Sequence, residues 1–151
     1  MSQHDTPELP AALQFMRLLW ALEHVLHKTS KRMAAELGVT GLQRLVIRMI
    51  GLSPGMSAGA LATVLHIDPS TLSGVLQRLA GQGLIRRGEH EADRRRAVLH
   101  LTVKGRRINA LRRGTVEAGV RAALQGVSAR DRRVARRVLD QICTRLDAGN
   151  S

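Results

Sequence analysis

The chain changes its hydrophobic spacing within the segment from Asp68 to Arg107, and this change limits the folds that it can adopt. The first half has apolar residues at the i, i+3, i+4, i+7 spacing of one buried helix face: Leu72, Val75, Leu76 and Leu79. After two glycines, the second half has the apolar spacing of two extended strands: Leu84 and Ile85, then Val98, Leu99 and Leu101. The segment therefore predicts a helix that leads directly into a β-hairpin, with a polar tip from Gly88 to Ala92.

The opposite face of the predicted helix is polar. It carries Ser70, Ser73, Gly74 and Gln77, with Arg78 at its margin. Hydroxyl and amide groups can bond to phosphates or base edges, and a glycine lets a helix approach another surface closely. The helix start is well marked, because Asp68 suits an N-cap and Pro69 suits the first helical position. This face is suited to a DNA groove, although an ordinary solvent-exposed helix would show the same pattern.

Arginines flank the tip of the predicted hairpin: Arg86, Arg87, Arg94, Arg95 and Arg96. A guanidinium group is always charged, weakly hydrated and slim enough to enter a narrow minor groove. Asp93 lies beside this cluster and can orient one of the arginines. The alternative is a hairpin whose edge is kept soluble by charge.

Together these residues resemble the MarR (multiple antibiotic resistance regulator) family of bacterial winged-helix transcription factors. The matching pieces are DPSTLSGVLQRL, GLIRR, ADRRR and LHLTVKGRR, preceded by VTGLQRLVIRMIG and SAGALATVL. The resemblance implies a mainly α-helical fold with a small β-hairpin wing, a winged helix-turn-helix. It also implies one domain over residues 1–151, with the winged helix-turn-helix at 39–103 between dimerisation helices at 9–37 and 104–147.

The resemblance also implies which residues contact DNA. Major-groove recognition is expected from Ser70, Thr71, Ser73, Gly74, Gln77 and Arg78, and minor-groove contact from Asp93, Arg94 and Arg95. Ser57, at the start of the SAGALATVL helix, can bond a phosphate, but a simple N-cap explains it as well. Arg44 stands where many relatives have a bulky apolar residue, which leaves the shape of an effector pocket open.

The function implied is that of a sequence-specific regulator of double-stranded DNA. A homodimer would occupy a palindromic operator with half-sites about 10 base pairs apart. It would act as a repressor released by a small effector, often an aromatic or phenolic anion. Two other classes remain open: a redox-responsive repressor acting through Cys143, and a non-specific architectural DNA-binding protein.

Charge supports a polyanionic partner independently. The 151-residue chain has 24 Lys and Arg against 12 Asp and Glu, a formal net charge of +12. Nucleic acid is the first candidate partner and a membrane surface the second. No apolar run approaches the ~20 residues needed to span a bilayer, and the N-terminal MSQHDTPELP lacks the pattern of a signal peptide, so a cytoplasmic protein is expected.

Long helices are predicted on both sides of the central segment. One runs from about Leu9 to Leu37, another continues from Thr102 to a break at Gln125, and Ser128 caps a last helix. The arginine pairs on the C-terminal helices are interpreted as solvated surface, with partners such as Asp140 for Arg136, rather than as a second DNA contact.

The remaining reactive groups are few. Cys143 is the single cysteine and lies among apolar positions of the last helix, where packing is favoured over redox sensing. His24 and His27 have metal-ligand spacing, but no second ligand pair accompanies them, so no metal or other cofactor is predicted. No nucleophile and base pair, carboxylate pair or phosphate-binding loop is evident, and we predict a protein that is not an enzyme.

Overall fold

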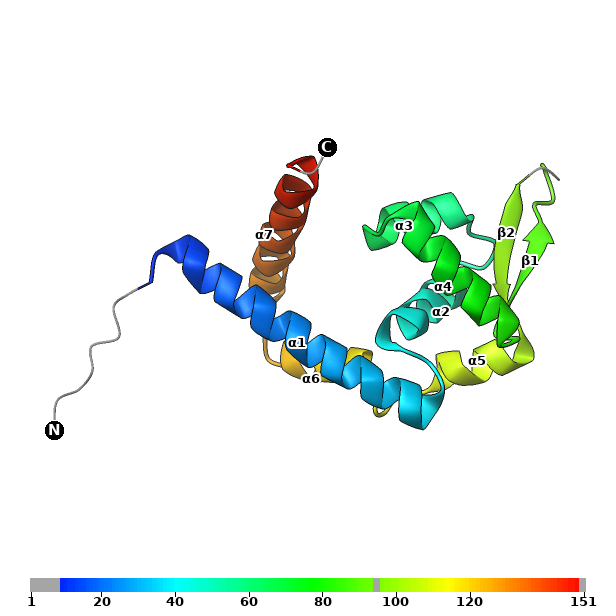
Figure 1. Ribbon diagram of the computed structural model, residues 1–151, viewed down its shortest axis with the longest axis horizontal. Helices are drawn as coiled ribbons and strands as arrows, with labels where there is room; N and C mark the ends of the chain where they lie inside the picture. Colours follow the sequence, from blue (N-terminus) through cyan, green and yellow to red (C-terminus); the bar gives the residue numbers. More distant parts are fainter. Residues whose placement is uncertain (1–8, 94–95, 150–151) are drawn as a thin grey trace, which may run out of the picture. The chain divides into compact units, whose positions relative to one another are not determined.

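Helices make up most of the chain, with one hairpin between the fourth and fifth. The computed structural model describes residues 9–93 and 96–149. In chain order the elements are α1 (Ala11–Leu37), α2 (Gly41–Leu52), α3 (Ala58–Leu65), α4 (Pro69–Gly81), β1 (Ile85–Glu89), β2 (Ala97–Leu101), α5 (Val103–Ala110), α6 (Val116–Leu124) and α7 (Ala129–Ala148) (Figure 1). The chain divides into two compact units, one up to Val116 and one from Glu117. The expected fold class, mainly α-helical with a small β-hairpin, is confirmed.

The core of the first unit lies between α2, α3, α4 and the hairpin. The predicted apolar face of α4 is buried, with Leu72, Val75, Leu76 and Leu79 between 0% and 5% exposed. These side chains meet residues from the other elements: Val46, Ile47 and Ile50 of α2, Leu61 of α3, and Leu84, Ile85, Leu99 and Leu101 around the hairpin. Because one face of α4 is fixed in the core, its opposite face is held towards solvent.

The hairpin is antiparallel, with Ile85 paired to Leu101 and Glu89 paired to Ala97. The strands extend further than the sequence predicts, because Gly88 and Glu89 belong to β1 and not to the tip. The turn is closed by a backbone hydrogen bond from His90 N to Arg96 O at 3.2 Å. Leu99 also forms an isolated bridge with Met56, so a short segment before α3 extends the sheet on its other edge.

The helix expected to continue from Thr102 to Gln125 is interrupted, which corrects the prediction. α5 ends at Ala110, α6 begins at Val116, and Gly114 between them has a φ of +70°. The carbonyl oxygens of Asn109 and Leu111 accept hydrogen bonds from Arg44 Nη2 at 3.1 and 2.7 Å. In a continuing helix these carbonyls would accept from backbone amides four residues on, so the arginine takes the place of the next turn.

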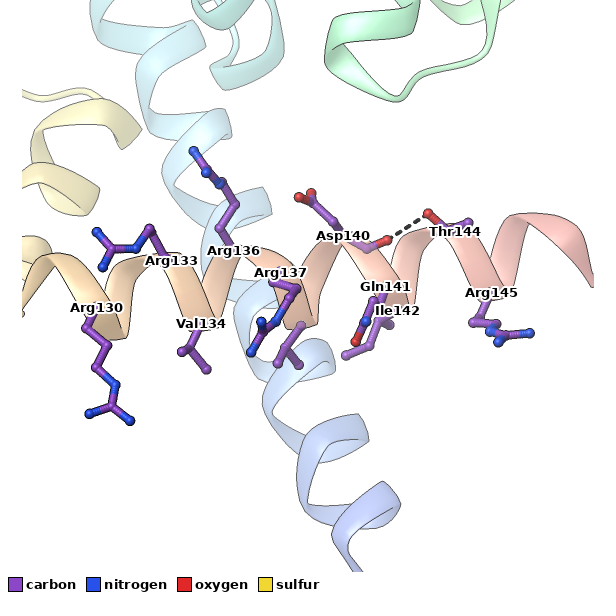
Figure 2. Close-up of a pocket in the computed structure, with 11 residues that line it drawn as sticks. Arg130, Arg133, Val134, Arg136, Arg137, Asp140, Gln141, Ile142, Thr144 and Arg145 are labelled. Atoms are coloured by element: carbon purple, nitrogen blue, oxygen red, sulfur yellow. Dashed lines mark hydrogen bonds between the residues drawn. The ribbon is translucent and has the colours of Figure 1, made fainter.

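The second unit consists of two amphipathic helices. Ser128 caps α7 as predicted, its Oγ accepting from Asp131 N at 3.0 Å. The predicted ion pair between Arg136 and Asp140 is wrong, since these two described side chains form none. The backbone carbonyl of Asp140 instead accepts a hydrogen bond from Thr144 Oγ1 (Figure 2). Pairing two exposed side chains gains little in water, so both stay solvated.

Candidate nucleic-acid interface

The polar face of α4 is open to solvent. Ser70, Thr71, Ser73, Gln77 and Arg78 are exposed and Gly74 is half-buried. A Cβ built at Gly74 would meet no atom within 4 Å, so none of the residues that the structure describes covers the middle of this face. The structure thus brings the six predicted recognition residues together on one side of one helix, α4.

Asp68 does more at the start of α4 than the sequence predicts. Its carboxylate accepts from the backbone amides of Ser70 and Thr71, at 3.1 and 3.4 Å, and also from the Ser70 hydroxyl. The Ser70 hydroxyl bond, followed by the Thr71 amide, lowers the pKa of Asp68 below its usual value. The hydroxyl of Ser70 is therefore committed as a donor and is left to act as an acceptor.

Ser57 caps α3 in a different way. Its Oγ accepts from Ala60 N at 3.2 Å, and no acidic residue lies in the first turn of α3. The positive end of the helix dipole is therefore not neutralised there, whereas the Asp68 carboxylate neutralises that of α4. Ser57 has the cap role that the sequence allowed, and its phosphate contact stays a prediction.

The hairpin presents cationic side chains next to α4. Arg86, Arg87 and Arg96 are exposed, as is Asp93, whose backbone amide donates to His90 O at 3.2 Å. His90 also accepts from Ala92 N through its Nδ1 at 3.2 Å, which shapes the turn. Two predicted wing residues, Arg94 and Arg95, lie outside the described residues.

Hydrogen bonds that the sequence did not predict tie the end of α4 to its neighbours. Gln82 Nε2 donates to Gly38 O at 3.2 Å, just after α1, and Lys104 Nζ donates to Gln82 O at 2.9 Å. Thr102 Oγ1 donates to Gly83 O at 2.6 Å and also caps α5. The angle between α4 and the hairpin is therefore held by both packing and polar contacts.

The other candidate groups lie apart from this face. Cys143 is exposed, so the packing expected of it is not made within the chain. His24 and His27 are exposed on α1. Across residues 9–93 and 96–149, no three His, Cys, Asp or Glu side chains are grouped so that they could hold a metal ion. The described helices include none with the length and hydropathy needed to cross a bilayer.

Residues 37–96, which hold this face and the first strand of the hairpin, match the model of the MarR family. The transcriptional regulatory protein proposed for the hcr operon of Thauera aromatica is 38% identical over 85 residues, which are 56% of this chain and 49% of that protein. The HTH-type transcriptional repressor Mb2911 of Mycobacterium bovis is 26% identical over 125 residues, 83% of this chain and 90% of the repressor. The chain thus spans about half the length of the first relative.

Two solved structures share the fold. The MepR–DNA complex of S. aureus has a TM-score of 0.71 at 17% identity and covers 92% of this chain and 99% of MepR. The PcaV regulator of Streptomyces coelicolor, in complex with its natural ligand, has a TM-score of 0.70 at 21% identity, covering 92% and 98%. Residues 37–96 of the chain are thus similar to the MarR family, and the mainly helical fold with its hairpin is shared with winged-helix regulators such as MepR.

Proposed function

We propose that the protein is a sequence-specific regulator that binds double-stranded DNA as a homodimer, represses transcription and is released by a small-molecule effector. The observation that carries this proposal is the uncovered polar face of α4, held by its buried side next to a cationic hairpin. A helix of this kind fits a major groove, and the neighbouring arginines fit the adjacent minor groove.

Charge favours the same partner. The net charge of +12 attracts a polyanion from a distance, and exposed arginines on the hairpin can neutralise phosphates. MepR, which shares the fold, has been solved on DNA. Binding by this route releases counterions, so affinity for any duplex is expected to fall steeply as salt rises.

We call α2 to α5, with the hairpin between α4 and α5, the reading head. The helices outside it support a dimer. Large apolar side chains are exposed along α1, among them Phe15, Leu18, Trp20, Leu22 and Val25, each between 46% and 66% exposed. α6 and α7 expose Val120, Leu139 and Leu146 in the same way. Exposed apolar surface of this extent is typical of interaction sites, and a second copy of the chain would cover it.

A small effector is the third part of the proposal. The PcaV structure holds its natural ligand within the same fold. In this protein the dimer would have two conformations, one with its reading heads spaced to fit the operator and one without. A small aromatic or phenolic anion would bind more tightly to the conformation that does not fit the operator. Such a difference in affinity is what a ligand needs in order to release DNA.

The sharpest test places a charge in the middle of the α4 face. Gly74→Glu should leave folding intact, because a side chain there meets open space and glutamate has a higher helix propensity than glycine. Its carboxylate would face phosphates and bases, so operator affinity should fall at least about a hundredfold in a gel-shift titration.

Gln125→Glu is the matched control, because it adds the same charge at an exposed position in the turn between α6 and α7. It should change affinity only about twofold, through the small change in net charge. If Gly74→Glu binds the operator as the control does, α4 does not face DNA and the proposal is wrong.

A further inference from the structure

Arg44 is a buried cation at the end of the reading head. It is 2% exposed, on the side of α2 that faces the end of α5. Its Nη2 donates to Leu111 O at 2.7 Å and to Asn109 O at 3.1 Å. A buried guanidinium needs such partners, and the C-terminal end of a helix offers both free carbonyls and a partial negative charge. The contact therefore fastens the last turn of α5 to α2.

Three other residues of α2, at positions 41, 48 and 51, lie on the same face as Arg44, and we call this face the Arg44 stripe. Arg48 Nη1 donates to Asn109 Oδ1 at 3.0 Å, and a Cβ at Gly51 would lie 2.6 Å from Asn109 Nδ2. Gly41 N donates to Ser30 Oγ of α1 at 2.8 Å. One stripe of α2 thus meets both α1 and the end of α5.

The chain reaches Val116, the last residue of the first unit, along the Arg44 stripe of α2. A Cβ at Gly41 would lie 3.3 Å from Val116 Cγ2, and Thr115 is 4% exposed. The segment that begins at Leu111, which contacts Arg44, and ends before Val116, which contacts Gly41, is not helical and includes Gly114 at φ +70°. A short segment with a glycine hinge has little stiffness of its own, so its direction depends on how its ends are held.

We infer that Arg44 is a positioning residue, which fixes the direction in which the chain leaves the reading head and so sets the spacing of the two heads on DNA. The inference rests on the proposed dimeric DNA-binding function. A leucine in its place would fill part of the space but could not donate to the two carbonyls, so the end of α5 would lose both hydrogen bonds to Arg44 Nη2 and be held less firmly.

The experiment measures spacing and not affinity alone. Wild type, Arg44→Leu and Arg44→Lys are titrated against operator duplexes lengthened or shortened by two base pairs between the half-sites, and against a single half-site. Two base pairs rotate one half-site by about 70° relative to the other, so a rigid dimer should lose about tenfold or more in affinity. In Arg44→Leu this penalty should fall below about threefold, with half-site affinity within about twofold of wild type. Arg44→Lys, which can reach one carbonyl, should lie between them.

Arg112→Gln is the matched control. Arg112 Nη1 donates to the same two carbonyls, Asn109 O at 2.8 Å and Leu111 O at 3.2 Å, but it is exposed and does not join α5 to α2. Its loss should leave the spacing penalty unchanged.

Each other outcome is decisive. If Arg44→Leu keeps the wild-type penalty, or if neither Arg44 variant folds by circular dichroism, Arg44 serves stability alone and the inference is overturned. If wild type itself binds no duplex, or binds all spacings and random sequence equally, the proposed function has failed and not merely the role of Arg44.

Discussion

At the scale of single residues, Asp68 controls how α4 begins. Its carboxylate takes two backbone amides and the Ser70 hydroxyl, so the amides at this helix end are not available to a phosphate. Donors to a phosphate from α4 are then expected among side chains, such as those of Ser73, Gln77 and Arg78. The cap was predicted correctly from the sequence, but the bond from the Ser70 hydroxyl to Asp68 was not.

Asp68→Ala should lower the urea midpoint of unfolding at pH 7, while Asp68→Asn, which can still accept, should recover most of the loss. Because folding lowers the pKa of Asp68, its contribution is complete above the unfolded-state pKa of about 3.9 and is lost as pH falls through the lower folded value. The gap between wild type and Asp68→Ala should therefore shrink between pH 5 and pH 2. A gap that is constant over that range would contradict the ionised cap.

Arg95 is the residue on which the predicted minor-groove contact depends. Arg95→Ala should weaken operator binding by about tenfold or more, because a guanidinium in a narrow groove meets a strongly negative potential. Arg133→Ala removes the same charge from an exposed position of α7 and should have little effect. If Arg95→Ala binds the operator within twofold of wild type by fluorescence anisotropy, this groove assignment is wrong.

At the scale of elements, α5 depends on a close approach to the chain after α4. A Cβ at Gly105 would collide with the backbone carbonyl of Leu84, which already accepts from Thr102 N at 3.1 Å. Neither partner can move without shifting α5 or the hairpin. The glycine is therefore required for packing and not for backbone flexibility.

Gly105→Ala should destabilise the protein by about 2 kcal/mol or more, since an extra methyl against rigid backbone forces whole elements apart. Gly74→Ala, in open space on α4, should stabilise it by about 0.5 kcal/mol. Both free energies of unfolding follow from urea denaturation. Equal effects of the two substitutions would mean that α5 does not approach Leu84 as described.

The helices and strands were predicted well wherever the spacing of apolar residues and the N-cap residues indicated the same element. The buried face of α4, the caps Asp68 and Ser128, and the two strands all follow from residues near one another in the chain. The same local signals set which side of α4 faces solvent. The fold class and the geometry of that face could therefore be predicted without a structure.

The rest depends on contacts between distant residues. The end of α5 at Ala110 follows from Arg44, more than sixty positions earlier, and periodicity alone favoured a continuous helix. The bridge between Met56 and Leu99 and the bond from Gln82 to Gly38 are likewise long-range. No local pattern encodes such pairs, although the spacing of Gly41, Arg44, Arg48 and Gly51 on one face of α2 was a signal that could have been noticed.

At the scale of the whole molecule, binding to a palindromic site requires two reading heads. α1, α6 and α7 expose more apolar surface than a stable monomer would leave in water. Sedimentation velocity at micromolar concentration should therefore show a species of twice the 16.5 kDa chain mass. A single monomeric species at these concentrations would remove the basis for a palindromic site.

The most direct test of a symmetric, sequence-specific complex is hydroxyl-radical footprinting on the DNA that flanks the protein's own gene, with excess random duplex present. A sequence-specific dimer should protect patches related by a twofold axis, with centres about 10 base pairs apart, and the protection should persist as random duplex is added. Uniform protection that the random duplex abolishes would contradict it and would indicate a non-specific architectural protein.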